Sequence, residues 1–370
     1  MIQNRGNINS HVWILQNFAE STEADKAVGQ LFTGAADYHF NKMLTEAGLP
    51  VYDTFYHVYT DKLQAASLIN IYRPPIILLC GTHKEKKTYD STTVKDFCPE
   101  VASKKKPYAV SMENQAGSLL QSNFINYPHY CIPIWPLQRI YEDWAYRDIY
   151  INLDLGHAKD ELDYFHKNGT LQSLPIYNFI VEPSFAELRD YFFDKLFKAK
   201  TITNDIETIG HTLRKKKNSK FFGHPGYFYV NGIGVSRSEA ISYSLWDYTP
   251  KELVQIWKWT DLLFQGLTTI IGQNFFNFDL WWLQALGFQY DLKKIKDTYV
   301  RQHILWPELP RSLQFMTKQY TRCPYYKDEG KHWNPKQKKS YMRYNCMDCV
   351  NTFEVYEKQN EEFMDRPNLM

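Results

Sequence analysis

The sequence predicts an α/β protein built from two globular domains, and three observations support this prediction. The chain has 370 residues, more than one typical hydrophobic core accommodates. Short apolar segments alternate along it with segments of helical periodicity, the pattern of sheets covered by helices. Hydrophobic residues make up 44% of the sequence and aromatic residues 16%, so both domains have ample material for a core.

The first half begins with an apolar segment, residues 11–15, which we expect to be a strand. A helical pattern follows and ends at Gly48. Further extended segments are expected at residues 75–80 and 130–135, and a helix at residues 155–165. Strands that alternate with helices indicate a three-layer α/β unit.

The second half is expected to begin near residue 195, which gives predicted domains of residues 1–195 and 196–370. Ser184 and Glu187 have the spacing of a capping box and predict a helix just before this boundary. Strands are then predicted at residues 201–206, 228–234, 240–244 and 269–272, and helices at 250–265, 279–286 and 344–358. This order predicts a mixed sheet.

Composition excludes several classes of protein. The formal net charge is only +2, so any binding of nucleic acid must rely on local basic runs such as residues 214–217 and 336–339. The six cysteines lack the paired spacing of a zinc site, and we expect buried, reduced thiols. We see neither a secretory signal nor the roughly 18 consecutive apolar residues of a membrane span. We therefore expect a cytoplasmic protein that does not bind membranes.

Three short motifs carry carboxylates suited to metal binding. Asp205 and Glu207 are two residues apart in a predicted strand, which places both side chains on one face. Asp279 begins a predicted helix in an aromatic setting, where an unpaired carboxylate is costly to bury. Tyr344 and Asp348 are one helical turn apart and share a helix face. Each motif alone also fits a plain alternative, namely an exposed acidic pair, a helix N-cap or a structural hydrogen bond.

Taken together and in this order, the motifs D-x-E, N-x-x-x-F-D and Y-x-x-x-D resemble those of the DEDDy 3′→5′ exonucleases. The resemblance is to the proofreading domain of phage-type family A DNA polymerases and covers roughly residues 196–358. It implies an RNase H-like fold and two Mg²⁺ or Mn²⁺ ions. By analogy, Asp205 would bridge both ions, Glu207 and Asp348 would complete the site of the attacking water, and Asp279 would support the second ion.

The resemblance also assigns residues around the metal ligands. Tyr344 would position the attacking water, since a phenol with a pKa of about 10 is a poor base at neutral pH. Asn274 would hold the substrate or the active-site loop, and Thr208 and Phe278 would bind the substrate. The implied substrate is the 3′ end of single-stranded DNA, with release of nucleoside 5′-monophosphates in proofreading or end processing during DNA replication.

No polymerase motif follows Asp348. We therefore expect a separate DNA polymerase subunit as partner, unless the chain is the front part of a longer enzyme. If the protein is phage-encoded, it would act in the host cytoplasm. Two alternatives stay open: a non-catalytic replisome scaffold or polymerase accessory protein, and an RNA-trimming exonuclease of the RNase D type.

Residues 1–195 resemble a uracil-DNA glycosylase-like domain, through the opening strand, the Gly34-to-Gly48 helix and the segment 132–136. Two catalytic pieces of that family are replaced. The acidic water-activating loop reads Gln16-Asn17-Phe18-Ala19-Glu20, and the His-Pro motif reads Trp135-Pro136. Because an indole cannot replace the imidazole, we expect this domain to bind DNA or a polymerase partner without glycosylase activity.

Overall fold

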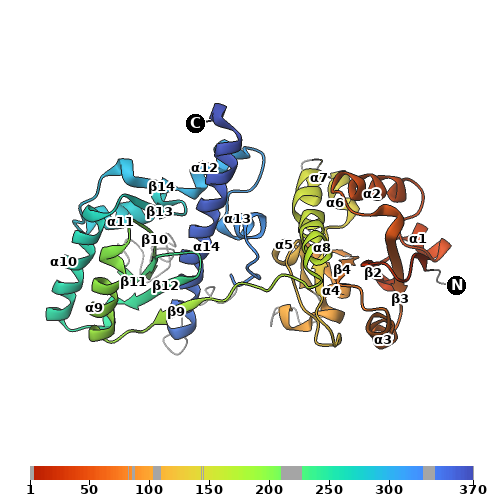
Figure 1. The fold of residues 1–370 in the computed structure, drawn as a ribbon, viewed down its shortest axis with the longest axis horizontal. Coiled ribbons are helices and arrows are strands. Elements are labelled where there is room, and N and C mark those ends of the chain that lie inside the picture. The colour runs from red at the N-terminus through yellow and green to blue at the C-terminus, as the bar shows by residue number, and fades with distance from the viewer. Residues whose placement is uncertain are drawn as a thin grey trace, which may run out of the picture. The chain divides into compact units, whose positions relative to one another are not determined.

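The computed structural model describes residues 4–81, 83–85, 88–102, 110–142, 144, 146–209, 227–327 and 338–369. The chain forms two compact units (Figure 1): Met1–Leu174 with Arg322–Tyr325, and Pro175–Thr321 with Tyr326–Met370. The boundary lies at Leu174 rather than at the predicted residue 195. The reason is that β9 (Asn178–Val181) pairs in parallel with β12 (Glu239–Ser244) and so belongs to the second unit's sheet.

The first unit is built on a five-stranded sheet in the order β1-β3-β2-β4-β8. The strands are β1 (Arg5–Gly6), β2 (Val12–Asn17), β3 (Thr54–Tyr59), β4 (Ile76–Cys80) and β8 (Tyr130–Pro133). All pair in parallel except β1, which is antiparallel to β3. Every residue of β4 is buried, as expected when both faces of a parallel sheet are covered.

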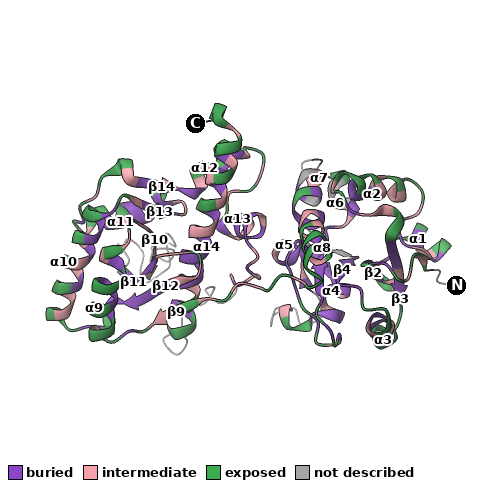
Figure 2. Cartoon of the chain, in the orientation of Figure 1, coloured by how far each residue is buried: buried purple, intermediate pink, exposed green. Residues whose placement is uncertain are grey.

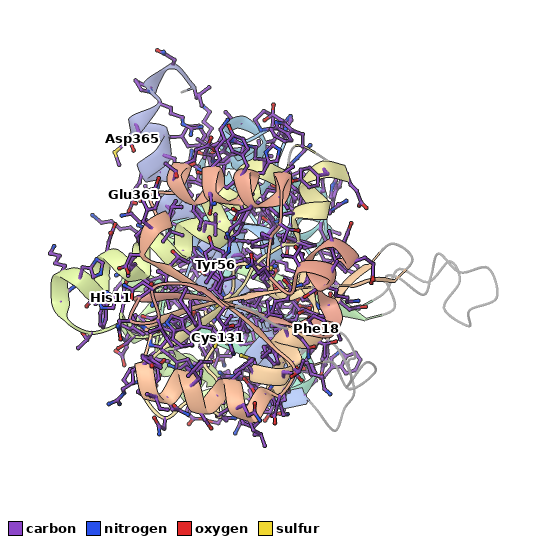
Figure 3. All side chains as sticks on the ribbon, turned by 90° about the vertical axis from the view of Figure 1, so that its right-hand side faces the viewer. His11, Phe18, Tyr56, Cys131, Glu361 and Asp365 are labelled. Atoms are coloured by element: carbon purple, nitrogen blue, oxygen red, sulfur yellow. The ribbon has the colours of Figure 1, made fainter. Side chains whose placement is uncertain are left out.

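Helices lie on both sides of this sheet. In the two views of Figures 1 and 3, α2 (Ala35–Glu46) and α3 (Lys62–Tyr72) flank it from opposite sides. The predicted three-layer α/β arrangement is therefore confirmed, while the resemblance to uracil-DNA glycosylases stays a prediction. The remaining main helices are α1 (Glu23–Val28), α4 (Thr92–Phe97), α5 (Met112–Gln115), α6 (Leu137–Glu142), α7 (Tyr146–Ile149) and α8 (Gly156–Asn168). A small sheet contains β5 (His83–Glu85), β6 (Thr88–Ser91) and β7 (Val110–Ser111).

The second unit contains a six-stranded mixed sheet in the order β14-β13-β10-β11-β12-β9. Its further strands are β10 (Thr201–Ile209), β11 (Tyr227–Gly234), β13 (Thr269–Gly272) and β14 (Ile295–Asp297). β10, β11 and β12 form an antiparallel meander, and β13 and β14 continue it in parallel. The central strands thus have the order 3-2-1-4-5 of the RNase H-like fold, with β9 added at the edge, so the predicted fold class is confirmed.

The helices of this unit are α9 (Phe185–Asp194), α10 (Pro250–Gly266), α11 (Asp279–Ala285), α12 (Thr298–Leu305), α13 (Leu313–Tyr320) and α14 (Lys338–Asp365). The predicted capping box of Ser184 and Glu187 is formed at the start of α9. The strands are largely buried, and α9 and α10 expose their outer faces (Figure 2). α14 is longer than predicted at both ends because packing supports it along most of its length.

Two glycines let α14 approach the sheet closely. α14 packs against β10, β11 and β12. A Cβ atom added at Gly232 of β11 would lie 2.1 Å from the side-chain oxygen of Asn345, and one added at Gly234 would lie 3.2 Å from the Cβ atom of Cys349. The absence of a side chain at Gly232 therefore leaves room for Asn345 of the helix, while at Gly234 it leaves room mainly for the Thr203 hydroxyl of β10 and makes the contact with Cys349 less tight.

The other expectations that the structure tests concern the cysteines and membrane spans. All six cysteines are free and buried, as predicted. Of the helices that the structure describes, none has the length and hydropathy needed to span a membrane. The basic run at residues 214–217 lies outside the described residues, as do residues 336 and 337 of the second run.

Gly232→Ala is predicted to lower the free energy of unfolding of the second unit by about 1–3 kcal/mol, because the added methyl group overpacks a buried contact. Thermal unfolding measures this effect. Gly266→Ala is the matched control, since an added Cβ there meets nothing within 4 Å. Equal stability of the two variants would contradict the close packing of α14 on β11.

Candidate active site

Strand β10 presents Asp205 and Glu207 on one face. Alternation along the strand turns Ile202 and Ile206 into the hydrophobic core on the opposite face. Asp205 lies opposite Gly232 of β11, so the carboxylate faces the place where α14 comes nearest to the sheet. The local pattern of apolar and acidic residues therefore fixes both carboxylates toward the helix.

Helix α14 adds Asp348 to this pair. Asp205, Glu207 and Asp348 each offer one oxygen atom, and these three atoms all lie within 4.8 Å of one another. Asp348 is buried, while Asp205 and Glu207 are partly exposed. Carboxylate oxygens so arranged are the hard donors that Mg²⁺ and Mn²⁺ prefer. The site residues present therefore fit the divalent ions predicted from the sequence.

Asp279 lies beside this cluster of three. It begins α11 and is 3% exposed. One of its carboxylate oxygens accepts a hydrogen bond of 3.0 Å from the backbone N–H of Ile206, which lies between Asp205 and Glu207 in the strand. The structure therefore brings Asp279 to the D-x-E strand, but its oxygens do not belong to the compact group of three.

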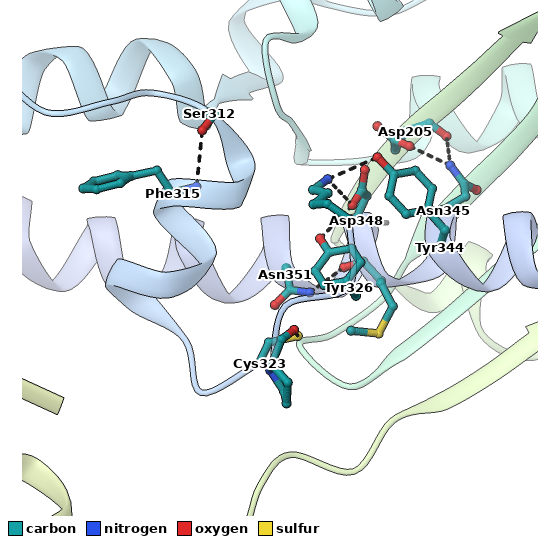
Figure 4. A network of polar contacts seen from close by, with 12 residues as sticks. Asp205, Ser312, Phe315, Cys323, Tyr326, Tyr344, Asn345, Asp348 and Asn351 are labelled. Carbon is teal, nitrogen blue, oxygen red and sulfur yellow. Dashed lines mark hydrogen bonds and ion pairs between the residues drawn. The ribbon is translucent and has the colours of Figure 1, made fainter. Parts of the chain in front are cut away.

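A second layer of side chains orients the carboxylates. Asn345 donates its side-chain N–H to a carboxylate oxygen of Asp205 at 2.6 Å and to the carbonyl of Asp205 at 3.1 Å (Figure 4). The hydroxyl of Ser242 donates to the side-chain oxygen of Asn345 at 2.7 Å, which fixes the orientation of that amide. Tyr341 donates its hydroxyl to Glu207 at 2.8 Å.

Asp348 is contacted by two residues that precede α14 in the chain, Tyr326 and Lys327. The Tyr326 hydroxyl donates to Asp348 Oδ1 at 2.7 Å (Figure 4). The ammonium group of Lys327 donates to the same oxygen and lies 3.3 Å from the hydroxyl of Tyr344. Sequence reasoning gave no role to Tyr326, Lys327, Tyr341 or Asn345. The one signal in the sequence is helical spacing, which places Tyr341 and Asn345 on the same helix face as Asp348 of the third motif.

Crowding of negative charge shifts the acidity of the site. Burial raises the pKa of Asp205 well above its usual range, and the charges of Asp348 and Glu207 raise it further. Burial and the charge of Asp348 raise the pKa of Glu207 to about 7. Burial likewise raises the pKa of Asp279, although the hydrogen bond from Ile206 opposes the shift. Protons or cations must therefore compensate these carboxylates near neutral pH.

Tyr344 stays a neutral phenol in this environment. Burial and the neighbouring carboxylates raise its pKa far above the usual range. A phenol that keeps its proton can donate or accept a hydrogen bond but cannot remove a proton at neutral pH. The raised pKa agrees with the predicted role of Tyr344 in positioning water.

The predicted substrate-binding residues lie around the site rather than in the cluster. Asn274 has a left-handed backbone conformation with φ of 56°, and its side-chain oxygen accepts a hydrogen bond from Asn277 at 2.8 Å. Thr208 follows Glu207 at a register shift in β10. Phe278 packs in part against the core of the second unit. Substrate contact by these residues stays a prediction.

Asp297 holds the loop that precedes Asp279. Its carboxylate accepts hydrogen bonds from the backbone N–H groups of Asn274 at 2.9 Å and Phe276 at 3.2 Å. It also caps α12 by accepting from the backbone of Tyr299 at 2.9 Å. This single buried carboxylate therefore ties the second motif to β14.

No protein-family model and no curated protein matches the chain. Similar solved structures include the catalytic core of RRP6 from Trypanosoma brucei, with 14% identity, a TM-score of 0.38 and coverage of 54% of this chain and 52% of that one. The Aedes aegypti Nibbler EXO domain has 10% identity and a TM-score of 0.39, and the match covers 53% of this chain and 94% of that one. Escherichia coli RNase D, an exoribonuclease involved in structured RNA processing, has 11% identity and a TM-score of 0.38, with coverage of 52% of this chain and 46% of that one. The chain thus spans about half the length of the RRP6 core.

Similarity of this degree does not indicate a substrate. The class that the strand order and the cluster themselves define is an RNase H-like domain with a carboxylate centre suited to divalent ions.

The raised pKa values predict how stability depends on pH without metal. A carboxyl group whose pKa is raised from 4.5 to about 7 on folding stabilises the fold below pH 4.5, and this contribution is lost as the pH rises through 7. The melting temperature in EDTA should therefore fall by a few degrees between pH 5 and 8. Mg²⁺ replaces the protons, so its stabilising effect should grow with pH.

Glu207→Gln is the matched variant, because it removes the titrating carboxyl and keeps its shape. Its melting temperature in EDTA should depend less on pH than that of the wild type. A stabilisation by Mg²⁺ that is equal at pH 5 and pH 8 would contradict the assignment of these carboxylates to the ion site.

Proposed function

We propose that the second unit is a metal-dependent 3′→5′ exonuclease that hydrolyses the terminal phosphodiester of a nucleic acid. The observation that carries this proposal is the convergence of oxygens from Asp205, Glu207 and Asp348 within 4.8 Å, with each carboxylate held by hydrogen bonds from its neighbours. A residue set kept only for structure would have no need to bring three acids together at such electrostatic cost.

Each residue of the site has its own role in the proposed reaction. Asp205, Glu207 and Asp348 would hold the ions, with Asp279 beside them. Two bound divalent ions supply stabilisation of the attacking and leaving oxygens in an in-line displacement. The neutral hydroxyl of Tyr344 orients the attacking water. Asn345 keeps Asp205 in one rotamer, so the carboxylate loses little freedom when it binds a cation.

The proposed substrate is a single-stranded 3′ end. The resemblance of the motifs to proofreading domains favours DNA. A separate DNA polymerase subunit as partner and a cytoplasmic location are proposed with it. RNA is the alternative, and among the structural neighbours E. coli RNase D is an exoribonuclease. Both substrates share the phosphodiester on which the carboxylate centre acts, so a direct comparison of rates must decide between them.

The first unit is proposed to bind DNA or a partner without glycosylase chemistry. Glu20 is the acid of the segment that follows β2. Its carboxylate accepts hydrogen bonds from the backbone N–H groups of Thr92 at 2.6 Å and Thr93 at 2.8 Å, and so caps the start of α4. Trp135 is buried and packs edge to face with Tyr89 and Tyr146. Glu20 and Trp135 therefore both stabilise this unit.

Asp205→Asn is predicted to lower the rate of nucleotide release by about 1000-fold or more, because the substitution removes a charge that the ions require. The assay uses 5′-labelled single-stranded DNA and RNA of one sequence with Mg²⁺, in which removal of 3′ nucleotides gives a descending ladder. Asp247→Asn is the control, since Asp247 pairs with Lys338 outside the cluster.

Retention of full activity by Asp205→Asn would overturn the assignment. Faster cleavage of RNA than of DNA would support RNA trimming instead of proofreading, and the assignment of the nuclease site would still hold. Wild-type protein that cleaves neither substrate would favour the non-catalytic scaffold.

A further inference from the structure

An ammonium group lies inside the carboxylate site. The side chain of Lys327 is 15% exposed and forms an ion pair with Asp348 Oδ1. Its Nζ atom lies 3.3 Å from the hydroxyl of Tyr344, 4.9 Å from the centre of the Tyr344 ring and 5.1 Å from that of Tyr326. The two rings and the carboxylate therefore hold this cation at the face of the metal-binding cluster.

Asp348 serves the ion pair and the cluster at once. The oxygen that accepts from Lys327 also accepts from the hydroxyl of Tyr326 at 2.7 Å. Asp348 is at the same time one of the three acids whose oxygens lie within 4.8 Å of one another. An ion held by these acids would lie close to the ammonium group, and like charges at such a distance repel.

We propose that Lys327 is the resident counter-cation of this site and that it sets the affinity of the site for divalent ions. In the protein without metal, its ammonium group compensates part of the negative charge of the cluster. Binding of an ion competes with that group for Asp348. The inference rests on the proposed function only in so far as the cluster binds divalent ions.

The contacts of Lys327 distinguish it from an ordinary ion pair. Lys338 of α14 forms such an ordinary, partly exposed pair, since it contacts Asp247 and Glu182, neither of which belongs to the cluster. The partner of Lys327, in contrast, is a proposed metal ligand, and its second neighbour is the phenol proposed to position water. A change at Lys327 therefore acts on ion binding directly, whereas a change at Lys338 acts on packing alone.

The test is calorimetric titration of the full chain with Mn²⁺, on wild type, Lys327→Met, Lys327→Arg and Lys338→Met. Lys327→Met should bind Mn²⁺ about tenfold more tightly than wild type, a typical size for coupling between two sites. Lys327→Arg keeps the charge and should bind within about twofold of wild type. Lys338→Met should leave the affinity unchanged.

Thermal unfolding provides a second readout that does not depend on activity. In EDTA, Lys327→Met should melt below wild type, because its cluster has lost a compensating charge. Addition of Mn²⁺ should raise its melting temperature more than that of wild type. A lysine that merely braces Asp348 would instead lower the melting temperature and weaken ion binding together.

The outcomes separate this inference from the proposed function. Unchanged or weaker Mn²⁺ binding by Lys327→Met, when wild type binds, overturns the counter-cation role and leaves the nuclease proposal intact. Tighter binding by Lys327→Met in a protein that cleaves no nucleic acid supports the counter-cation and overturns the nuclease. Binding by Lys327→Met alone supports an ammonium group that excludes ions, and binding by none of the variants contradicts both proposals.

Discussion

The close contact between α14 and β11 is the constraint on which the rest of the site depends. Gly232 leaves room for the side chain of Asn345, and Asn345 in turn holds Asp205 while Ser242 holds Asn345. The same approach carries Asp348, three residues further along the helix, to the two carboxylates of β10. The geometry of the carboxylate site therefore depends on the packing of α14 against the sheet, because a helix displaced outward would separate Asp348 from the two acids of β10.

The grouping of acids opposes folding in the absence of cations. Burial raises the pKa of Asp205 and of Glu207, and the charge of Asp348 raises both further. The structure offsets this cost with directed donors: the backbone of Ile206 at Asp279, Tyr341 at Glu207, and Tyr326 and Lys327 at Asp348. Electrostatic repulsion of this kind is typical of functional sites, in which a bound ligand neutralises the charges of the residues.

Much of the fold and of the acidic cluster followed from the sequence, because strand alternation and helical spacing are local. The D-x-E strand, the capping box of α9 and the shared face of Tyr344 and Asp348 are examples. β3 and α3 were missed, since His57 and the flanking polar residues interrupt the apolar pattern. The contacts of Lys327 and Asn345 could not be predicted, because each depends on which distant residue the fold places opposite it. The junction was placed too late because β9 pairs with a strand some sixty residues further along the chain.

Binding of two divalent ions by the cluster can be observed by anomalous X-ray diffraction from crystals soaked in Mn²⁺. We expect two anomalous peaks about 3.5–4 Å apart beside the carboxylates of Asp205, Glu207 and Asp348, and their loss in Asp205→Asn. Crystals of the wild-type protein that show no peak at these carboxylates, at Mn²⁺ concentrations that saturate other sites, would contradict it.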